Sequence, residues 1–471
     1  MDSVVNNVYL SEVHLFERDN KYFVYLVQNM YLYEVDYETY EQIKKMQNEY
    51  GGKRPVHIHD DELISSGILY ESVAPLNDSA DMDSDVPKSS PQNYPLTSVV
   101  LEIANDCNLN CIYCYGQGGS YGRKRELMTF EVAKKAIDFM VENSGDSNEL
   151  LVTFFGGEPL INFAVVKDVL YYCKKIEKEI NKKFSFSMTT NGTILNDEIF
   201  DFIKDNRVSV MISIDGDRDI QNKHRCYCNG KGSFDDVKKN IHRFKEARGG
   251  YLTARATVCS TDIRFNKIRN DLFEMGFTNV FTSMVDTDEK SPLFIGGDYT
   301  PLILEQYRIL ADEYVKAIME GRIIRNDFIT SKLSDIYYKK CHIRGCSAGN
   351  YSIAVGTDGY IYPCHRFMGM EESIIGHLNT GINLELQHQY HEATVDRKKE
   401  CRDCWARYLC GGGCPHTSVV HRGDIFCAPT CYCDTYRGFF EIVLFTYWEL
   451  KEWDDNVFRK ILEKEKNCSS N

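Results

Sequence analysis

The sequence has little of what marks membrane or secreted proteins. The apolar run nearest the end, 439–448, is short and contains Glu441, and no run approaches the length of a membrane span. Residues 1–16 lack a basic segment followed by an apolar core, so we expect no secretory signal and a cytoplasmic protein without a membrane partner. Prolines number only 11, and four of them lie between 75 and 95.

Positive charge is also scarce, because 55 Lys and Arg residues face 69 Asp and Glu residues, a net charge of −14. Proteins that bind nucleic acid over a large surface more often carry excess positive charge, so we expect no nucleic-acid partner. An apolar content of 43% and a charged content of 26% are typical of globular proteins and exclude wholesale disorder. The 471 residues suffice for about three domains.

Cysteine, by contrast, is abundant, with 18 residues. Without a secretory signal, such thiols are more often metal ligands or catalysts than disulfides. Three lie at Cys107, Cys111 and Cys114, and ten lie between Cys341 and Cys433. We expect the scattered remainder to be small buried apolar residues.

The first 74 residues resemble a small separate α+β unit. Two segments rich in aromatic and β-branched residues, 22–27 and 30–35, predict a hairpin. A helix is expected at 37–50 with Asp36 as its N-cap, and a shorter one near 60–66. The four clustered prolines predict a linker over 75–96.

From residue 97 the pattern alternates between strand and amphipathic helix, which indicates parallel βα units. We predict strands at 98–103, 150–155, 184–189, 208–214, 252–258 and 280–285. The expected fold class is α/β, a partial (β/α)6 TIM-type barrel over 97–320. A loop-rich, cysteine-rich region at 321–437 and a final helix at 438–471 would follow.

Unusual residues follow the ends of the predicted strands, where such barrels place their chemistry. The first strand ends before Cys107, the second at Gly156-Gly157-Glu158-Pro159, the third at Thr190-Asn191-Gly192 and the fourth at Asp215-Gly216. The three thiolates of the 107–114 loop can hold three irons of a [4Fe–4S] cube and leave the fourth free. A zinc site would need a fourth ligand, and no nearby His supplies one.

This cysteine spacing, followed by Gly156-Gly157-Glu158-Pro159, resembles the radical S-adenosylmethionine enzymes over 98–285. The resemblance implies that an electron from the reduced cluster cleaves S-adenosylmethionine into methionine and a 5′-deoxyadenosyl radical, which takes hydrogen from a substrate carbon. It also implies that Tyr113 lies against adenine and that Glu158 helps bind the methionine amino group. The other implied cofactor contacts are Gly156, Gly157, Asn191, Ser213 and Arg225. A plain turn at 156–159 and a surface ion pair for Arg225 are the alternatives.

The later cysteines, with Gly359 five residues before Cys364, resemble a SPASM domain, which holds two auxiliary [4Fe–4S] clusters and forms a loop-rich Fe–S C-terminal domain. Three clusters are then expected in all. The resemblance assigns one auxiliary cluster to Cys346, Cys364 and Cys414, and the other to Cys401, Cys404, Cys410 and Cys433. Cys431 or Cys427 are the alternatives to Cys433, and Cys341 either completes the first cluster or leaves it with an open iron. A zinc ribbon using Cys401 and Cys404 is the alternative for the region.

The segments 345–349 and 362–367 are similar to maturases that form thioether cross-links in cysteine-rich, ribosomally made precursor peptides. In sulfatase-maturing relatives an aspartate follows the cysteine at 364, whereas this chain has His365, as a base or a hydrogen-bonding group. The N-terminal unit resembles the winged-helix-like leader-peptide recognition element, which would take the leader as an added strand. An ordinary accessory domain is its alternative.

The predicted function is therefore thioether formation between a peptide cysteine sulfur and an acceptor carbon, with an external reductant such as flavodoxin or ferredoxin. Other radical SAM–SPASM modifications compete with it, namely formylglycine formation, a carbon–carbon cross-link or epimerisation. A non-catalytic iron–sulfur electron carrier and a zinc-binding module are the alternatives from other classes.

Overall fold

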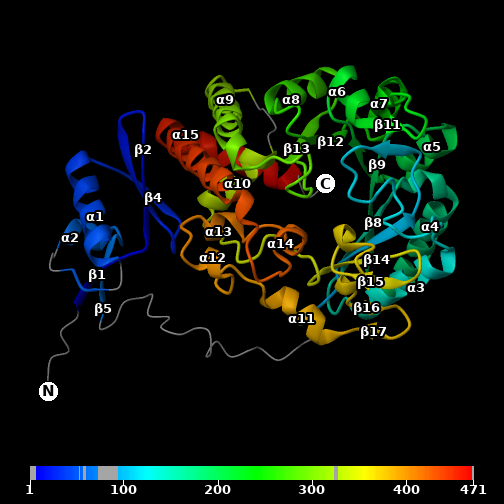
Figure 1. The fold of residues 1–471 in the computed structure, drawn as a ribbon, viewed down its shortest axis with the longest axis horizontal. Coiled ribbons are helices and arrows are strands. Elements are labelled where there is room, and N and C mark those ends of the chain that lie inside the picture. The colour runs from blue at the N-terminus through cyan, green and yellow to red at the C-terminus, as the bar shows by residue number, and fades with distance from the viewer. Residues whose placement is uncertain (1–6, 52–53, 57–59, 73–93, 323–326, 469–471) are drawn as a thin grey trace.

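The parallel sheet is the centre of the computed structural model, which describes residues 7–51, 54–56, 60–72, 94–322 and 327–468 (Figure 1). The six predicted strands all form, in the spatial order β13-β12-β10-β9-β8-β6, and every neighbouring pair is parallel. They are β6 (Ser98–Ala104), β8 (Glu149–Gly156), β9 (Lys183–Thr190), β10 (Ser209–Ser213), β12 (Thr253–Val258) and β13 (Asn279–Met284). The α/β barrel class is confirmed.

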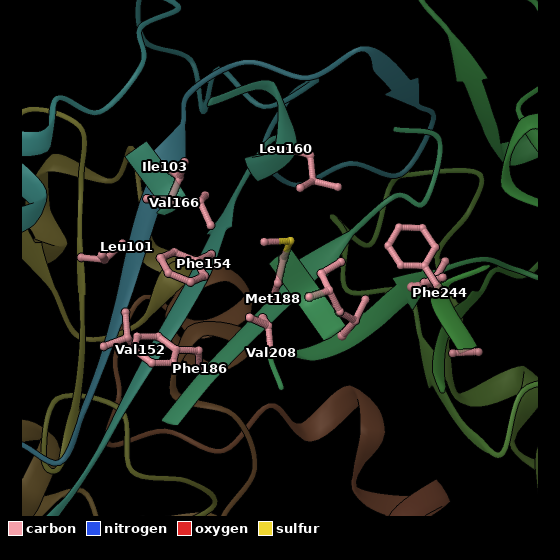
Figure 2. Packing of buried hydrophobic residues seen from close by; sticks show 14 of the residues in the cluster. Leu101, Ile103, Val152, Phe154, Leu160, Val166, Phe186, Met188, Val208 and Phe244 are labelled. Carbon is pink, nitrogen blue, oxygen red and sulfur yellow. The ribbon is translucent and has the colours of Figure 1, made fainter. Parts of the chain in front are cut away.

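Alternating side chains divide each strand between an outer, helix-covered face and the barrel interior. In β8 the buried Val152 and Phe154 pack outward with Phe186 and Met188 of β9 (Figure 2). The helices that cover the outer face present apolar stripes at helical spacing. In α4 (Phe163–Ile180), the buried residues Val166, Val169, Leu170 and Cys173 form such a stripe. These helices are α3 (Phe130–Glu142), α4, α5 (Asp197–Asn206), α6 (Arg218–His224), α7 (Phe234–Ala247) and α8 (Phe265–Glu274). The next two helices, α9 (Thr300–Met319) and α10 (Asp327–Tyr337), bury most of their apolar residues in a second core with the last helix and the N-terminal hairpin.

The sheet continues beyond β6 into the cysteine-rich region, which the sequence did not predict. Strand β14 (Ser352–Val355) pairs in parallel with β6, and β15 (Tyr360–Tyr362), β16 (Gly376–His377) and β17 (Gly381–Ile382) follow in antiparallel order. Cys364 and His365 come directly after β15. The pairing with β6 therefore brings the cysteine-rich region to the barrel by hydrogen bonds.

The rest of the cysteine-rich region is built from short helices and lies between the barrel and the N-terminal segment (Figure 1). The helices are α11 (Leu384–Glu392), α12 (Lys399–Arg402), α13 (Arg407–Cys410) and α14 (Pro415–Arg422), followed by the 3-10 turn η5 (Thr430–Tyr432). The last helix, α15 (Cys433–Cys468), begins at Cys433, five residues before the predicted boundary, and leaves helical geometry at Asp454. Within the described ranges, no helix combines the length and apolar character needed to cross a bilayer.

The N-terminal segment forms the expected hairpin and helices. Strands β2 (Val13–Arg18), β3 (Lys21–Leu26) and β4 (Tyr31–Val35) make an antiparallel sheet, and β1 (Asn7–Leu10) pairs with β5 (Leu69–Ser72). Helix α1 (Tyr37–Tyr50) is capped by Asp36, whose carboxylate accepts from the Thr39 N–H, and α2 (Asp61–Ser65) follows.

The N-terminal sheet packs on the last helix. The Phe23 ring centroid lies 5.7 Å from that of Phe445 and 5.4 Å from that of Trp448. Most of the predicted linker, 75–93, lies outside the described residues, while Leu96 at its end is buried in the barrel core. The first and last parts of the chain therefore share one apolar core.

Candidate active site

The first cysteine loop leaves the C-terminal end of β6. Within it, β7 (Leu109–Cys111) pairs antiparallel with β11 (Arg225–Tyr227), so that Arg225 lies opposite Cys111. Burial raises the pKa of the Cys107 thiol to about 12 and that of Cys111 to about 11, and neighbouring thiol charge adds to both. The thiolate forms of these cysteines are therefore stable only beside a positive charge. The irons of a cluster would supply that charge, so the three sulfur donors fit the predicted iron–sulfur cluster.

The turn at 156–159 packs directly on the backbone that precedes Cys107. A Cβ atom at Gly156 would lie 2.4 Å from the Ala104 carbonyl oxygen, and one at Gly157 would lie 2.1 Å from that of Asp106. Only glycine permits this approach. The two glycines are therefore required by the loop packing itself, and their predicted contact with a cofactor stays a prediction.

Glu158 joins the loops that follow β8 and β9. Its fully buried carboxylate accepts hydrogen bonds from the Thr190 hydroxyl (2.8 Å) and the Asn191 N–H (2.7 Å), and from the Leu160 N–H (3.1 Å). Burial raises the pKa of Glu158 to about 7, against the opposing effect of these donors. Asn191 in turn places its amide nitrogen 3.8 Å from the Cys107 sulfur. Glu158 thus holds the predicted cofactor loops together.

Arg225 and Tyr113 form a chain of hydrogen bonds that ends at Asp215, which was not among the predicted site residues. The Tyr113 hydroxyl donates to Oδ2 of Asp215 (2.5 Å), and Nη1 of Arg225 donates to the Tyr113 hydroxyl (2.7 Å). The Thr257 N–H fixes the other oxygen of Asp215 (3.0 Å). Arg225 is buried, which excludes a surface ion pair. The sequence signal for Asp215 was its position directly after the fourth strand.

Ser213 and His365 face the barrel interior. Ser213 lies on the opposite face of β10 from the core residue Ile212, beside Arg255 in the strand register. The His365 ring centroid lies 4.4 Å from that of Phe155. Burial, together with the charge of Arg366, lowers the pKa of His365 to about 3 and keeps it neutral. Arg255, which the sequence analysis did not select, supplies a cation to the same interior.

Comparison with known proteins identifies the chemistry of this site. Residues 101–258, which carry the three-cysteine loop, the Gly156–Pro159 turn and Arg225, match the family model of the radical SAM superfamily. This chain is a radical SAM enzyme. The assignment implies one [4Fe–4S] cluster and S-adenosylmethionine.

The radical SAM enzyme is also similar, over most of its length, to named proteins and to solved structures. It is 25% identical to a cysteine-type anaerobic sulfatase-maturating enzyme of Clostridium novyi over 370 residues, 74% of this chain and 94% of that one. The structure of native anSMEcpe with bound AdoMet and the Kp18Cys peptide superposes with a TM-score of 0.64 at 21% identity, covering 76% of this chain and 99% of that one. Streptococcus suis SuiB bound to its precursor peptide SuiA gives 0.50 at 15% identity, covering 90% and 99%. The two superpositions show the fold.

The structure gathers the later cysteines of this radical SAM enzyme into two groups. The second-cluster group lines one cavity and contains Cys401, Cys404, Cys410 and Cys433. In the first-cluster group, burial raises the pKa of Cys364 to about 12, and the nearby thiols of Cys346 and Cys414 add to the shift.

The three alternative cysteines have other neighbours in the structure. The Cys341 sulfur lies 3.6 Å from the Met30 sulfur in the N-terminal hairpin. Cys431 lies beside His421 and Glu289. Cys427 does not line the second-cluster cavity. Cys433 lines that cavity, whereas Cys427 and Cys431 do not, and its role as a cluster ligand stays a prediction.

Lys398, which the sequence analysis did not select, lies between the two cysteine groups. Its buried ammonium donates to the Gly412 carbonyl (2.9 Å) and lies 3.4 Å from the Ser418 hydroxyl. Burial lowers its pKa, and thiol charge from Cys401 and Cys414, one in each group, opposes that shift. A positive charge at this place favours thiolates in both groups.

Proposed function

We propose that this radical SAM enzyme installs thioether cross-links between cysteine sulfur and an acceptor-residue carbon in a cysteine-rich, ribosomally made precursor peptide. Cys107, Cys111 and Cys114 would hold the cluster that, with S-adenosylmethionine, supplies a hydrogen-abstracting 5′-deoxyadenosyl radical. The first-cluster and second-cluster groups would hold two auxiliary [4Fe–4S] clusters, and a flavodoxin or ferredoxin would supply electrons.

The observation that carries the proposal is the position of Cys341. The first-cluster group offers three thiols in the described ranges, while Cys341 faces Met30 and Tyr25 of the N-terminal sheet. Three protein ligands leave one iron of a cube available to an outside ligand. A peptide cysteine bound there would be deprotonated and held ready to form the carbon–sulfur bond.

His365 supports thioether formation over formylglycine formation. A general base works best when its pKa lies near the operating pH, and burial lowers the pKa of His365 to about 3. The neutral ring, packed on Phe155, is suited to hydrogen bonding and positioning in the barrel interior. Removal of a substrate proton by this residue is correspondingly disfavoured.

The N-terminal sheet is proposed to bind the leader part of the peptide. Its β2 side is engaged with the rest of the protein, because the His14 ring stacks on Trp405 with centroids 3.7 Å apart. Strand β4 is the opposite edge of the three-stranded sheet and carries the exposed Tyr31. An extended leader segment can add to such an edge through main-chain hydrogen bonds.

Formylglycine formation is the second candidate, because the Clostridium novyi relative carries the name of a sulfatase-maturating enzyme. One experiment separates the two. The reconstituted enzyme is incubated anaerobically with S-adenosylmethionine, a reductant and either a candidate cysteine-rich precursor or a cysteine-containing sulfatase peptide.

Thioether formation predicts loss of two hydrogens from the precursor, with one thiol protected from alkylation for each link. A precursor product with every thiol still alkylatable, or an aldehyde on the sulfatase peptide alone, would overturn the proposal. Cys111→Ala is the inactive control and should form no 5′-deoxyadenosine. Cys341→Ala should retain the cross-linking activity, because the Cys341 sulfur contacts Met30 of the N-terminal hairpin.

A further inference from the structure

A third group of metal-ligating side chains lies outside the cysteine groups assigned above. One donor atom each from Glu289, His421 and Cys431 lies within 4.8 Å of the other two. The three residues come from the loop after β13, from the last turn of α14 and from η5. Segments 130 residues apart in the chain thus converge on one point.

The orientation of His421 is set by Asp286. Nε2 of the imidazole lies 3.2 Å from Oδ1 of Asp286, and the ring is only 3% exposed. The other oxygen of Asp286 accepts from Arg366 (2.7 Å) and Thr417 (2.8 Å), so the carboxylate is held in place. When Nε2–H donates to Asp286, Nδ1 of the neutral ring carries a lone pair.

That lone pair faces a second carboxylate. Nδ1 of His421 lies 3.4 Å from Oε1 of Glu289, and both atoms are then acceptors. Two acceptors at this distance repel each other unless a cation or a proton lies between them. Zinc–nitrogen and zinc–oxygen bonds of about 2.0–2.1 Å at tetrahedral angles place the two ligand atoms about 3.4 Å apart. The spacing of His421 and Glu289 therefore fits two ligands of one zinc ion.

The surrounding residues complete a recognised arrangement. A histidine that binds zinc usually donates its second ring N–H to a carboxylate, and Asp286 occupies that position. Thiolate, imidazole and carboxylate together favour zinc over the harder magnesium and calcium ions. The Cys431 sulfur would lose its proton to solvent on binding.

We propose that Glu289, His421 through Nδ1, and Cys431 form a site for a divalent cation of the zinc class, with the fourth position open to water. The ion would fasten the loop after β13 to α14 and η5. Through Asp286 it would also steady Arg366, the neighbour of His365 in the barrel interior. The site is independent of the proposed peptide chemistry.

The test uses the full chain, reconstituted anaerobically with iron and sulfide and freed of zinc by a chelating resin. Zinc chloride is the probe, binding is measured by equilibrium dialysis, and zinc and iron are counted per chain. We expect one tightly held zinc in the parent protein. Affinity should fall at least tenfold in His421→Gln and in Cys431→Ser. Cys427→Ser is the matched control and should bind zinc as the parent does.

Zinc-edge X-ray absorption of the loaded parent protein decides the ligands without any variant. The expected shell contains one sulfur at about 2.3 Å with nitrogen and oxygen ligands. Three or four sulfurs would place zinc in a cluster site and overturn the proposal. Absence of zinc, or unchanged affinity in both variants at equal iron content, would also overturn it.

Discussion

Arg407 of the cysteine-rich region and Glu12 of the N-terminal segment form a double ion pair, in which two guanidinium nitrogens donate to the two carboxylate oxygens. The Arg407 side chain is 4% exposed and also lines the second-cluster cavity beside Cys404 and Cys410. One buried ion pair therefore links the proposed leader-binding sheet to a proposed cluster site.

Glu12→Gln should destabilise both the N-terminal sheet and the region around the second-cluster cavity. Removing one partner of a buried ion pair leaves the other charge without compensation, which costs roughly 3 kcal/mol. We expect a lower thermal transition and faster proteolytic cleavage of the N-terminal sheet. Glu34→Gln is the control, because the Lys21–Glu34 pair is about 38% exposed on each side and should contribute under about 1 kcal/mol. If Glu12→Gln and Glu34→Gln lowered the thermal transition equally, the Glu12–Arg407 pair would not be what links the two parts.

Glu158→Gln should weaken the cofactor loops although the side chain keeps its size. The carboxylate accepts from three donors, and an amide NH2 would face the N–H of Asn191 or Leu160. Leaving a buried donor unsatisfied costs about 1–3 kcal/mol. We expect reduced S-adenosylmethionine affinity in equilibrium binding, whereas the exposed Glu149→Gln should bind normally.

Lys398→Met should make the auxiliary clusters harder to reduce. The change removes a buried positive charge that lies between the two cysteine groups. At an effective dielectric constant near 20, the lost interaction is on the order of 1–2 kcal/mol for each electron. Redox titration followed by electron paramagnetic resonance measures the midpoint potentials. Lys399→Met, at the exposed neighbouring position, should leave the midpoint potentials unchanged. Identical potentials in the two variants would contradict the proposed effect of the Lys398 charge.

Lys339 should make stability depend on pH above 8. Its ammonium donates to the Met30 carbonyl (2.7 Å), and burial lowers its pKa to about 8. The unfolded chain, with a pKa near 10.4, binds more protons between these values, so stability rises as the pH increases through this window. Across this window the free energy of unfolding of the parent should rise by about 1–2 kcal/mol relative to that of Lys339→Met, after allowance for partial exposure.

Thermal unfolding of parent and Lys339→Met proteins at pH 7.5, 8.5 and 9.5 measures this gain. The exposed change Lys175→Met on α4 should show the parent's pH dependence. If the difference in stability between the parent and Lys339→Met stayed constant with pH, Lys339 would not be the source of the pH dependence.

Local patterns were enough to predict the barrel. Strand alternation in β8, with Val152 and Phe154 on one face, is readable without a partner strand, and so is the helical stripe around Val166. The pairing of β14 with β6 was missed because β14 is only four residues long and its partner lies some 250 residues earlier. Asp215 was noted at a strand end but not assigned, because its contact with Tyr113 depends on the loop that β7 and β11 shape.

The sequence by itself determined the strand and helix order, the radical SAM loop and the glycines of the 156–159 turn, since these depend on periodicity and spacing within short segments. Tertiary structure alone showed that Cys433 lines one cavity with Cys401, Cys404 and Cys410, while Cys431, two residues earlier, lies beside His421 and Glu289. It also decided the placement of Lys398 and the Glu12–Arg407 pair. Such contacts join residues far apart in the chain, and their energies come from burial and charge that no local pattern contains.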